Sequence, residues 1–152
     1  MLFRSLTKLF GRRRSWLLFA QTLIILGLLG MSSVDPQLSL NVVVWCALLV
    51  AFGSATQDIA LDAFRIESAQ SDYQAALAAT YQTGYRLALI WSGAGVLWLA
   101  ARAETASGSY DPGAWQFAYV CMAASIGVGV ITTLLSNEPA RVELPKARNA
   151  KA

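Results

Sequence analysis

Three charged residues at the end of a long apolar run are spaced to share one face of a helix. Asp58 and Asp62 are four residues apart, and Arg65 follows three residues later. Residues three or four apart lie above one another on a helix, so we call these three the charged stripe. Acids at a membrane span usually face protein or water, where they can exchange protons. The alternative is that the stripe is only the solvated end of a helix.

Arg86 lies deeper in an apolar segment than any other charge. At 1.5 Å per residue it is about 16 Å from the expected start of its helix, near the middle of the bilayer. A central arginine costs about 2.5–3.5 kcal/mol on translocon scales, so we expect a partner or a hydrated cavity around it. Asp58 is the candidate partner, because a long guanidinium reaches it if the two helices are neighbours. Snorkelling to the interface is the alternative.

A polar face accompanies Arg86 on the same predicted helix. Tyr81, Gln82 and Tyr85 lie around it at three- and four-residue steps, and Gln57 directly precedes the charged stripe. Aromatic and amide side chains of this kind can form a wall for a sugar or a peptide. They can equally be polar contacts between packed helices.

The inventory of residue types predicts neither a cofactor nor a metal site. The chain has no histidine, and Cys46 and Cys121 both lie inside apolar runs, where we expect small buried thiols. One alternative interpretation includes a metal site: Asp58 and Asp62 could bind Mg²⁺ together with a diphosphate, as in an intramembrane transferase. The second acid cluster of such enzymes is absent from the other apolar segments, so an enzyme is not the expected class.

Composition places the chain in a lipid bilayer. Of its 152 residues, 56% are hydrophobic and 14% are charged, and the mean hydropathy is +0.48. Soluble domains average about 25% charged residues. The net charge of +3 is modest and comes from the two chain ends, so a nucleic-acid partner is not expected. Since several apolar runs reach about 20 residues, the sequence predicts an all-α, polytopic membrane helix bundle.

Four apolar segments are predicted to cross the membrane. A basic segment, 1–14, precedes them and a charged tail, 137–152, follows them. Asp35-Pro36 and Asp111-Pro112 are expected to start the second and fourth helices, with Asp as N-cap and Pro at the first helical position. The four predicted transmembrane helices lie within 15–136 and cover about 15–33, 36–64, 72–101 and 112–136.

The distribution of basic residues predicts the orientation. With four crossings, both termini and the connection around Arg65 lie on one side of the membrane. All 12 Lys and Arg residues lie on that side except Arg86, which is inside a helix, and Arg102. By the positive-inside rule both termini are therefore cytoplasmic.

Three motifs together resemble the AmpG-type muropeptide permeases of the major facilitator superfamily. They are Gly-Arg-Arg-Arg-Ser-Trp at 11–16, Ser-Ala-Thr-Gln-Asp-Ile-Ala-Leu-Asp-Ala at 54–63, and Gly-Tyr-Arg at 84–86. Their order and spacing cover almost the whole chain, and the second motif is the most specific. The resemblance implies that the four segments correspond to transmembrane helices three to six, in the N-terminal half of a twelve-helix transporter.

The resemblance also implies a function. Family members import anhydro-muropeptides released from the cell wall across the bacterial inner membrane, driven by the proton gradient, for peptidoglycan recycling. The residues expected to take part are Asp58 and Asp62 in proton coupling, Arg86 in a cavity ion pair, Gln57, Tyr81, Gln82 and Tyr85 in substrate contacts, and Arg12, Arg13 and Arg14 in a cytoplasmic basic loop.

The length of the chain bears on these expectations. A transporter that works by alternating access needs two six-helix halves around a central site. Four helices from one half are therefore expected to be a fragment of a longer transporter, or to need a partner chain that supplies the missing helices. A small structural or regulatory membrane subunit that folds only with a partner is the remaining alternative.

Overall fold

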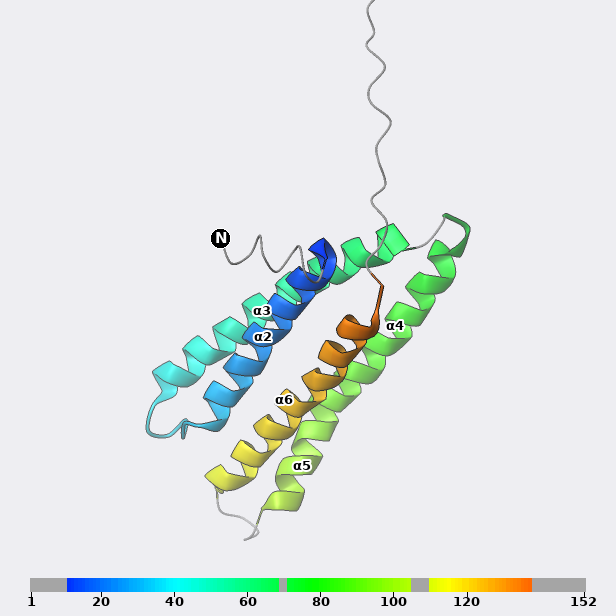
Figure 1. Ribbon diagram of the computed structural model, residues 1–152. Coiled ribbons are helices and arrows are strands. Elements are labelled where there is room, and N and C mark those ends of the chain that lie inside the picture. The colour runs from blue at the N-terminus through cyan, green and yellow to red at the C-terminus, as the bar shows by residue number, and fades with distance from the viewer. Residues whose placement is uncertain (1–10, 69–70, 105–109, 138–152) are drawn as a thin grey trace, which may run out of the picture.

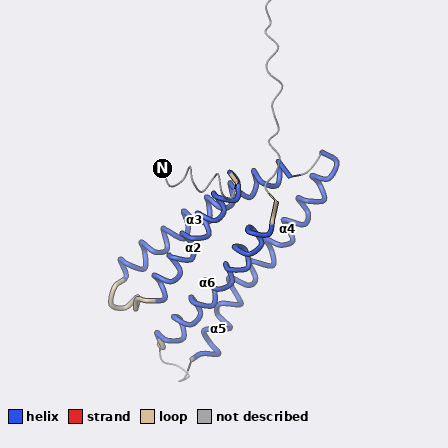
Figure 2. Tube along the Cα trace, viewed as in Figure 1, coloured by secondary structure: helices blue, strands red, loops and turns tan. Residues whose placement is uncertain are grey.

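The computed structural model describes residues 11–68, 71–104 and 110–137, and most of these residues are helical (Figure 1, Figure 2). The elements are α2 (Arg12–Ser32), α3 (Leu40–Ser68), a 3₁₀ turn η1 (Ser71–Tyr73), α4 (Gln74–Ile90), a π-helical turn η2 (Trp91–Gly95), α5 (Val96–Ala103) and α6 (Pro112–Leu135). No strand occurs in these three ranges, which confirms the all-α class. Most of the predicted basic segment, and all but Asn137 of the predicted tail, lie outside the described residues.

Three helices, α2, α3 and α6, are long and apolar enough to cross a membrane, with 21, 29 and 24 residues. About 20 residues are needed to cross a hydrocarbon core of ~30 Å, so the predicted helical membrane bundle is confirmed. The remaining predicted crossing is a continuous rod of α4, η2 and α5, with 17, 5 and 8 residues. Since none of these three segments alone reaches the length needed to cross, a fourth crossing stays a prediction.

The helices form two antiparallel hairpins that lie against each other. α2 packs along α3 and also along α6, and α5 packs on α6. Figure 1 shows α4 continuing the line of α5 beside α6. We call the end where α2 begins and where α3 and α6 finish the arginine end. The opposite end, where Asp35 and Tyr110 lie, is the tyrosine end.

Glycines allow α2 and α3 to approach closely. A Cβ atom on Gly27 would lie 2.5 Å from Cγ2 of Val50 and 2.9 Å from the carbonyl oxygen of Cys46. A Cβ atom on Gly53 would lie 2.9 Å from Cγ1 of Ile24. Small residues at helix crossings are a common means of association in membranes, because they bring backbones together.

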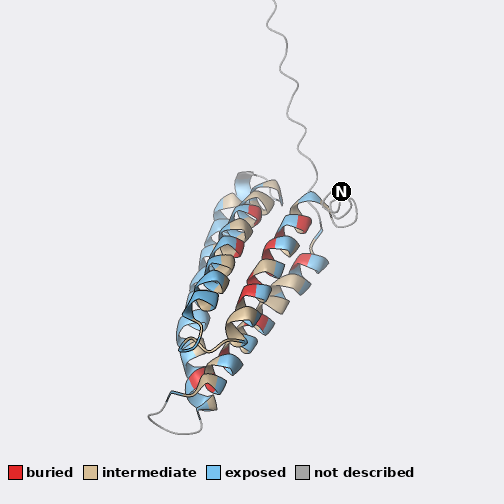
Figure 3. Ribbon diagram, turned by 90° about the vertical axis from the view of Figure 1, so that its left-hand side faces the viewer, coloured by how far each residue is buried: buried red, intermediate tan, exposed pale blue. Residues whose placement is uncertain are grey.

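Burial is concentrated on α2 and α6 (Figure 3). The buried apolar residues of these two helices are Leu17, Ala20, Ile24, Ala114, Ala118 and Ala123. α4 has no buried residue. The described part of the chain therefore leaves α4 uncovered.

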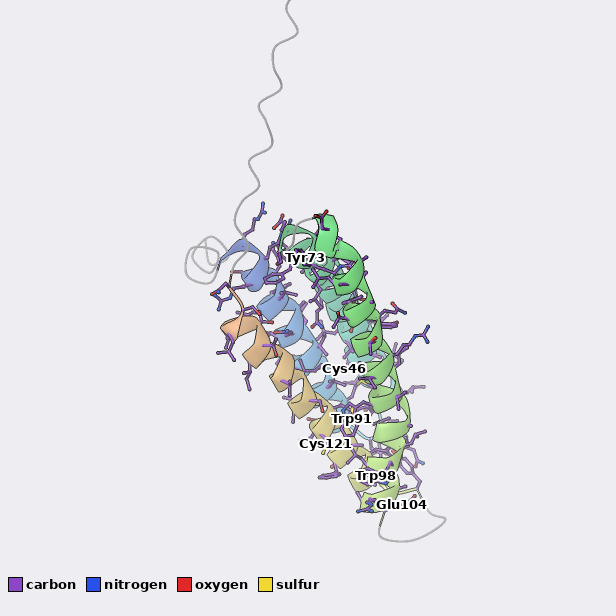
Figure 4. The ribbon with its side chains drawn as sticks, turned by 90° about the vertical axis from the view of Figure 1, so that its right-hand side faces the viewer. Cys46, Tyr73, Trp91, Trp98, Glu104 and Cys121 are labelled. Atoms are coloured by element: carbon purple, nitrogen blue, oxygen red, sulfur yellow. The ribbon has the colours of Figure 1, made fainter. Side chains whose placement is uncertain are left out.

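The π-helical turn lies where the rod changes from uncovered to packed. At this turn the indole Nε1 of Trp91 donates to Oγ of Ser125 on α6, at 3.2 Å (Figure 4). The ring also lies against Gly95, where a Cβ atom would be 2.7 Å from Trp91 Cε3. π-helical turns interrupt the regular hydrogen-bond pattern of a helix. Trp91 thus connects the rod to α6 at the point of interruption.

The predicted start of the second helix at Asp35-Pro36 is wrong, because α3 begins at Leu40. Oδ1 of Asp35 accepts from the backbone N–H of Gln37 at 2.9 Å, and its carbonyl accepts from the N–H of Leu38 at 3.0 Å. Aspartate forms local turns of this kind as readily as it caps helices. Asp35 therefore closes a turn before the helix.

The predicted start of the last helix is confirmed. Asp111 is the N-cap of α6, and its Oδ1 accepts from the backbone N–H of Gly113 at 2.9 Å. Pro112 occupies the first helical position, where its missing N–H costs nothing. The same two-residue signal thus marks a helix start in one connection and a turn in the other.

Candidate functional site

The basic triplet at the start of α2 contacts the last turn of α3. The guanidinium of Arg12 donates through NH2 to Oε1 of Glu67 at 3.1 Å, and Nε of Arg13 donates to Oε2 of Glu67 at 3.0 Å. A carboxylate between two guanidinium groups makes charge-assisted hydrogen bonds, which are stronger than neutral ones. Glu67 therefore fixes the end of α3 to the start of α2.

The third arginine of the triplet contacts α6. Nε of Arg14 donates to the carbonyl oxygen of Thr133 at 3.0 Å, and its NH2 group donates to the carbonyl oxygen of Leu134. The last carbonyls of a helix lack partners within the helix and carry its negative partial charge. We call the basic triplet, Glu67 and these two carbonyls the arginine clamp, since they hold three helix ends together.

The charged stripe is only partly paired. Oδ1 of Asp62 lies 3.3 Å from NH2 of Arg65, and Cζ of Arg65 lies 5.2 Å from the centre of the Tyr81 ring. Arg65 thus connects α3 to α4 near the arginine end. Because the carboxylate is about half exposed, the ion pair positions these groups more than it stabilises the fold.

Asp58 and Arg86 do not form the expected ion pair. Both side chains are exposed, and the ion pairs found within the described ranges involve neither of them. The reason is geometric: α4 does not pack along α3, and no residue of α4 is buried. Arg86 therefore lies on an open face of an apolar helix.

The expected wall for a sugar or peptide is divided between two places. Gln82 and Tyr85 are exposed on α4, and Tyr81 is half-buried under Arg65. Gln57 instead lines a cavity between α2, α3 and α6. The structure therefore groups the three α4 residues and separates Gln57 from them.

Metal ligands are not gathered in the described ranges. No group of three or more Asp, Glu, Cys or His side chains is placed there to hold a metal ion. Cys46 and Cys121 are free thiols on different helices.

Several curated proteins have sequences similar to that of the chain. The anhydromuropeptide permease of Escherichia coli K12 is 36% identical over 138 residues, which are 90% of this chain. The Rickettsia felis protein named as transporter AmpG 4 is 34% identical over 128 residues, or 84% of this chain. Over most of its length the chain is similar to one part of these AmpG-type permeases. An uncharacterized protein of Haemophilus influenzae is 38% identical over 141 residues, or 91% of this chain.

The AmpG-type relatives are much longer than the chain. It spans 26% of the Escherichia coli permease, 29% of the Rickettsia protein and 31% of the Haemophilus protein. No protein-family profile matches the chain, and no solved structure does. The likeness to AmpG-type permeases therefore rests on similarity between most of this chain and parts of these longer proteins.

Sequence reasoning missed two residues, Glu67 and Gln21, and one contact, that of Arg65 with Tyr81. Glu67 is the one acid in the connection between the predicted helices 36–64 and 72–101. This connection was predicted to lie on the same side of the membrane as Arg12, Arg13 and Arg14, which was the signal for the clamp. Arg65 was placed on the charged stripe, but its contact with Tyr81 needed the second helix. Gln21, a polar residue in an apolar helix, is buried against Thr133.

Proposed function

We propose that the chain forms four crossings of a proton-coupled permease in the inner membrane of a bacterium, with both termini in the cytoplasm. The substrate is an anhydro-muropeptide destined for peptidoglycan recycling. The single observation that carries this proposal is the open polar face of α4 beside the charged stripe of α3. The names permease and transporter of the relatives support it.

The physical argument concerns the surroundings of Arg86. An arginine facing acyl chains near the bilayer centre costs about 2.5–3.5 kcal/mol, so such residues face protein or water. α4 carries Arg86 with Gln82 and Tyr85 exposed beside it, and the described chain covers none of them. A water-filled path through a transporter would keep Arg86, Gln82 and Tyr85 hydrated, which avoids the cost of exposing them to lipid.

Proton coupling is assigned to Asp58 and Asp62. When Asp62 takes up a proton its charge is lost, and its attraction to Arg65, now 3.3 Å away, becomes weak. Arg65 also lies over Tyr81, so this change reaches the contact between α3 and α4. Asp58, one turn earlier, extends the acidic face toward the middle of the membrane. Protonation would thus alter the position of α4 relative to α3.

Substrate contacts are assigned to the open face of α4. A muropeptide offers sugar hydroxyls and peptide carboxylates. Tyr81, Gln82 and Tyr85 provide aromatic and amide groups for the sugar and the peptide, and Arg86 provides a guanidinium for a carboxylate. Gln57, predicted with this group, faces a different cavity.

The remaining helices of the transporter are proposed to cover α4. They belong either to a longer polypeptide, as in the relatives, or to a partner chain. If a partner chain supplies these helices, the chain is a subunit that folds with a partner. The uncovered surface of α4 is where such a partner would bind.

A chimera tests the proposal. The aligned 138-residue region of the Escherichia coli permease is replaced by this chain, and uptake of labelled anhydro-muropeptide is measured in cells lacking their own permease. We expect uptake by the chimera, and a loss of about tenfold or more in Asp62→Asn and Arg86→Gln, the size of a typical coupling energy.

Arg102→Gln is the matched control. Arg102 lies over the Trp98 ring at the tyrosine end, 4.6 Å from its centre, away from the proposed path. It should keep full uptake. A chimera that reaches the membrane in normal amount without uptake, or Asp62→Asn and Arg86→Gln variants that are as active as the parent chimera, would contradict the proposal.

A further inference from the structure

A cavity of about 230 Å³ lies between α2, α3 and α6, near the arginine clamp. Its polar lining includes Gln21 of α2, Gln57 of α3 and the hydroxyl residues of the last turns of α6. Leu17 and Phe64 are among its apolar residues. Two amide side chains from different helices therefore face one half-open cavity, whose rim includes the exposed residue Val128.

The amide oxygens of these two glutamines have no hydrogen-bond donor in the described chain. Gln21 is only 4% exposed, and its Nε2 donates to Oγ1 of Thr133 at 3.1 Å. Oε1 of Gln21 and Oε1 of Gln57 each expose less than 1 Å² and accept no hydrogen bond. Since buried polar atoms are almost always satisfied, each oxygen requires a donor from elsewhere.

The hydroxyl groups in the cavity cannot supply that donor. The hydroxyl of Thr133 donates to the carbonyl of Gly129 at 2.8 Å. The hydroxyl of Thr132 donates to the carbonyl of Val128, also at 2.8 Å. Ser136 donates to the carbonyl of Thr132 at 2.8 Å. Each hydroxyl has a single proton, so all three donors are committed to α6 itself.

We propose that ordered water occupies this cavity and donates to Oε1 of Gln21 and Oε1 of Gln57, which bridges α2 and α3 at the buried floor of the cavity. A water molecule has two donors and can serve both oxygens, and its own oxygen can accept from others in the cluster. Water occupies about 30 Å³ in the liquid, so the cavity has room for several molecules. This inference does not depend on the transport proposal.

The surroundings favour water over a metal cation. Carbonyl and hydroxyl oxygens can coordinate sodium, but no carboxylate lines this cavity. The guanidinium of Arg14, bound to the carbonyls of Thr133 and Leu134, adds a positive charge nearby. A neutral donor suits this environment better than a cation does.

Radiolytic footprinting of the whole chain in lipid nanodiscs tests the proposal. A brief X-ray pulse forms hydroxyl radicals from bound water, and mass spectrometry locates the oxidised side chains. Leu17 and Ile24 are both 4% exposed on α2, but only Leu17 lines the cavity. We expect Leu17 to be oxidised at least about fivefold faster than Ile24, because the water proposed in the cavity lies against Leu17 and not against Ile24.

The double variant Gln21→Leu, Gln57→Leu keeps nearly the same side-chain volume, removes both oxygens and adds no group that scavenges radicals faster than Leu17 does. We expect it to lower oxidation of Leu17 to the rate of Ile24, while circular dichroism reports an unchanged helix content. An unchanged rate at Leu17 in this variant would overturn the proposal. If the variant does not fold, equal rates at Leu17 and Ile24 in the parent protein overturn it.

Sodium serves as the second probe. The footprint is repeated in sodium chloride and in choline chloride at equal ionic strength. With water as the occupant, the rate at Leu17 is the same in both salts. Protection of Leu17 by sodium alone would replace water by a cation and overturn the proposal.

Discussion

α2 and α4 are both apolar helices that carry polar side chains, but their surroundings differ. Gln21 of α2 is 4% exposed and donates to Thr133 of α6. Arg86 of α4 is exposed and has no ion-pair partner within the described residues. The polar group of α2 is buried inside this chain, whereas those of α4 require surroundings that the described chain does not provide.

Glycines show the same contrast. Gly27 of α2 lies so close to α3 that a Cβ atom would collide with Val50. A Cβ atom on Gly84 of α4 would have nothing within 4 Å. A small residue therefore permits close packing without producing it, and the neighbouring helix must be present as well. The packed helices and the uncovered rod can be compared by variants placed in each.

The largest effect is expected from Gly27→Ala. The added methyl group would overlap Val50 and the carbonyl of Cys46, and overpacking of this kind costs about 1–3 kcal/mol. Gly84→Ala is the matched control, which should raise stability by up to about 1 kcal/mol through helix propensity. Unfolding in mixed micelles with increasing dodecyl sulfate measures both. Equal losses at the two positions would mean that α4 is packed as tightly as α2.

The open face of α4 can be probed with cysteine in a background without Cys46 and Cys121. Arg86→Cys should react with a water-soluble maleimide about tenfold faster than Leu87→Cys, because a thiol in lipid ionises less readily and one pKa unit changes the thiolate fraction tenfold. Leu87 lies at the same depth as Arg86 but on another face of α4. It shares that face with Thr80 and Thr83, whose hydroxyls donate to carbonyls of their own helix. Equal rates would remove the hydrated path from the proposal.

The arginine clamp should give a smaller loss. Glu67→Gln removes the charge that Arg12 and Arg13 share, so the melting temperature should fall by less than in Gly27→Ala. Added salt should lower the melting temperature of the parent toward that of the variant, because salt screens the pair. Glu104→Gln, at the exposed end of α5, is expected to change neither value. If the difference in melting temperature between the parent and Glu67→Gln does not depend on salt, the charge of Glu67 does not contribute to stability.

The smallest effect is expected at the tyrosine end. Partial burial and the hydrogen bond that Tyr110 donates to Asp35, at 3.0 Å, raise the pKa of Tyr110 above its usual value of 10.0. A raised pKa stabilises the fold while the hydroxyl is protonated, and the contribution is lost as the pH rises through the folded pKa. The melting temperature of the parent should therefore fall more steeply above pH 10 than that of Tyr110→Phe. Tyr73→Phe, an exposed tyrosine of η1, should retain the steep fall.

The sequence by itself determined the class of protein. Long apolar runs and a low fraction of charge are properties of composition, so they predicted the helical membrane bundle that the structure confirms. Asp111-Pro112 predicted the start of α6, where Asp111 caps the first turn, but the same signal at Asp35-Pro36 forms a turn before α3. The motifs around Arg12, Asp58 and Arg86 predicted a resemblance to the AmpG-type permeases, and the relatives confirm this resemblance.

The tertiary structure decided which side chains meet. Helical spacing placed Asp58, Asp62 and Arg65 on one face, but it could not show that Arg65 contacts Tyr81 while Asp58 and Arg86 remain apart. Gln57, next to Asp58 in the chain, points into a different space with Gln21. Periodicity describes one helix at a time, whereas contacts depend on which neighbours approach closely. For α2 these neighbours lie within the chain, and for α4 the described residues do not supply them.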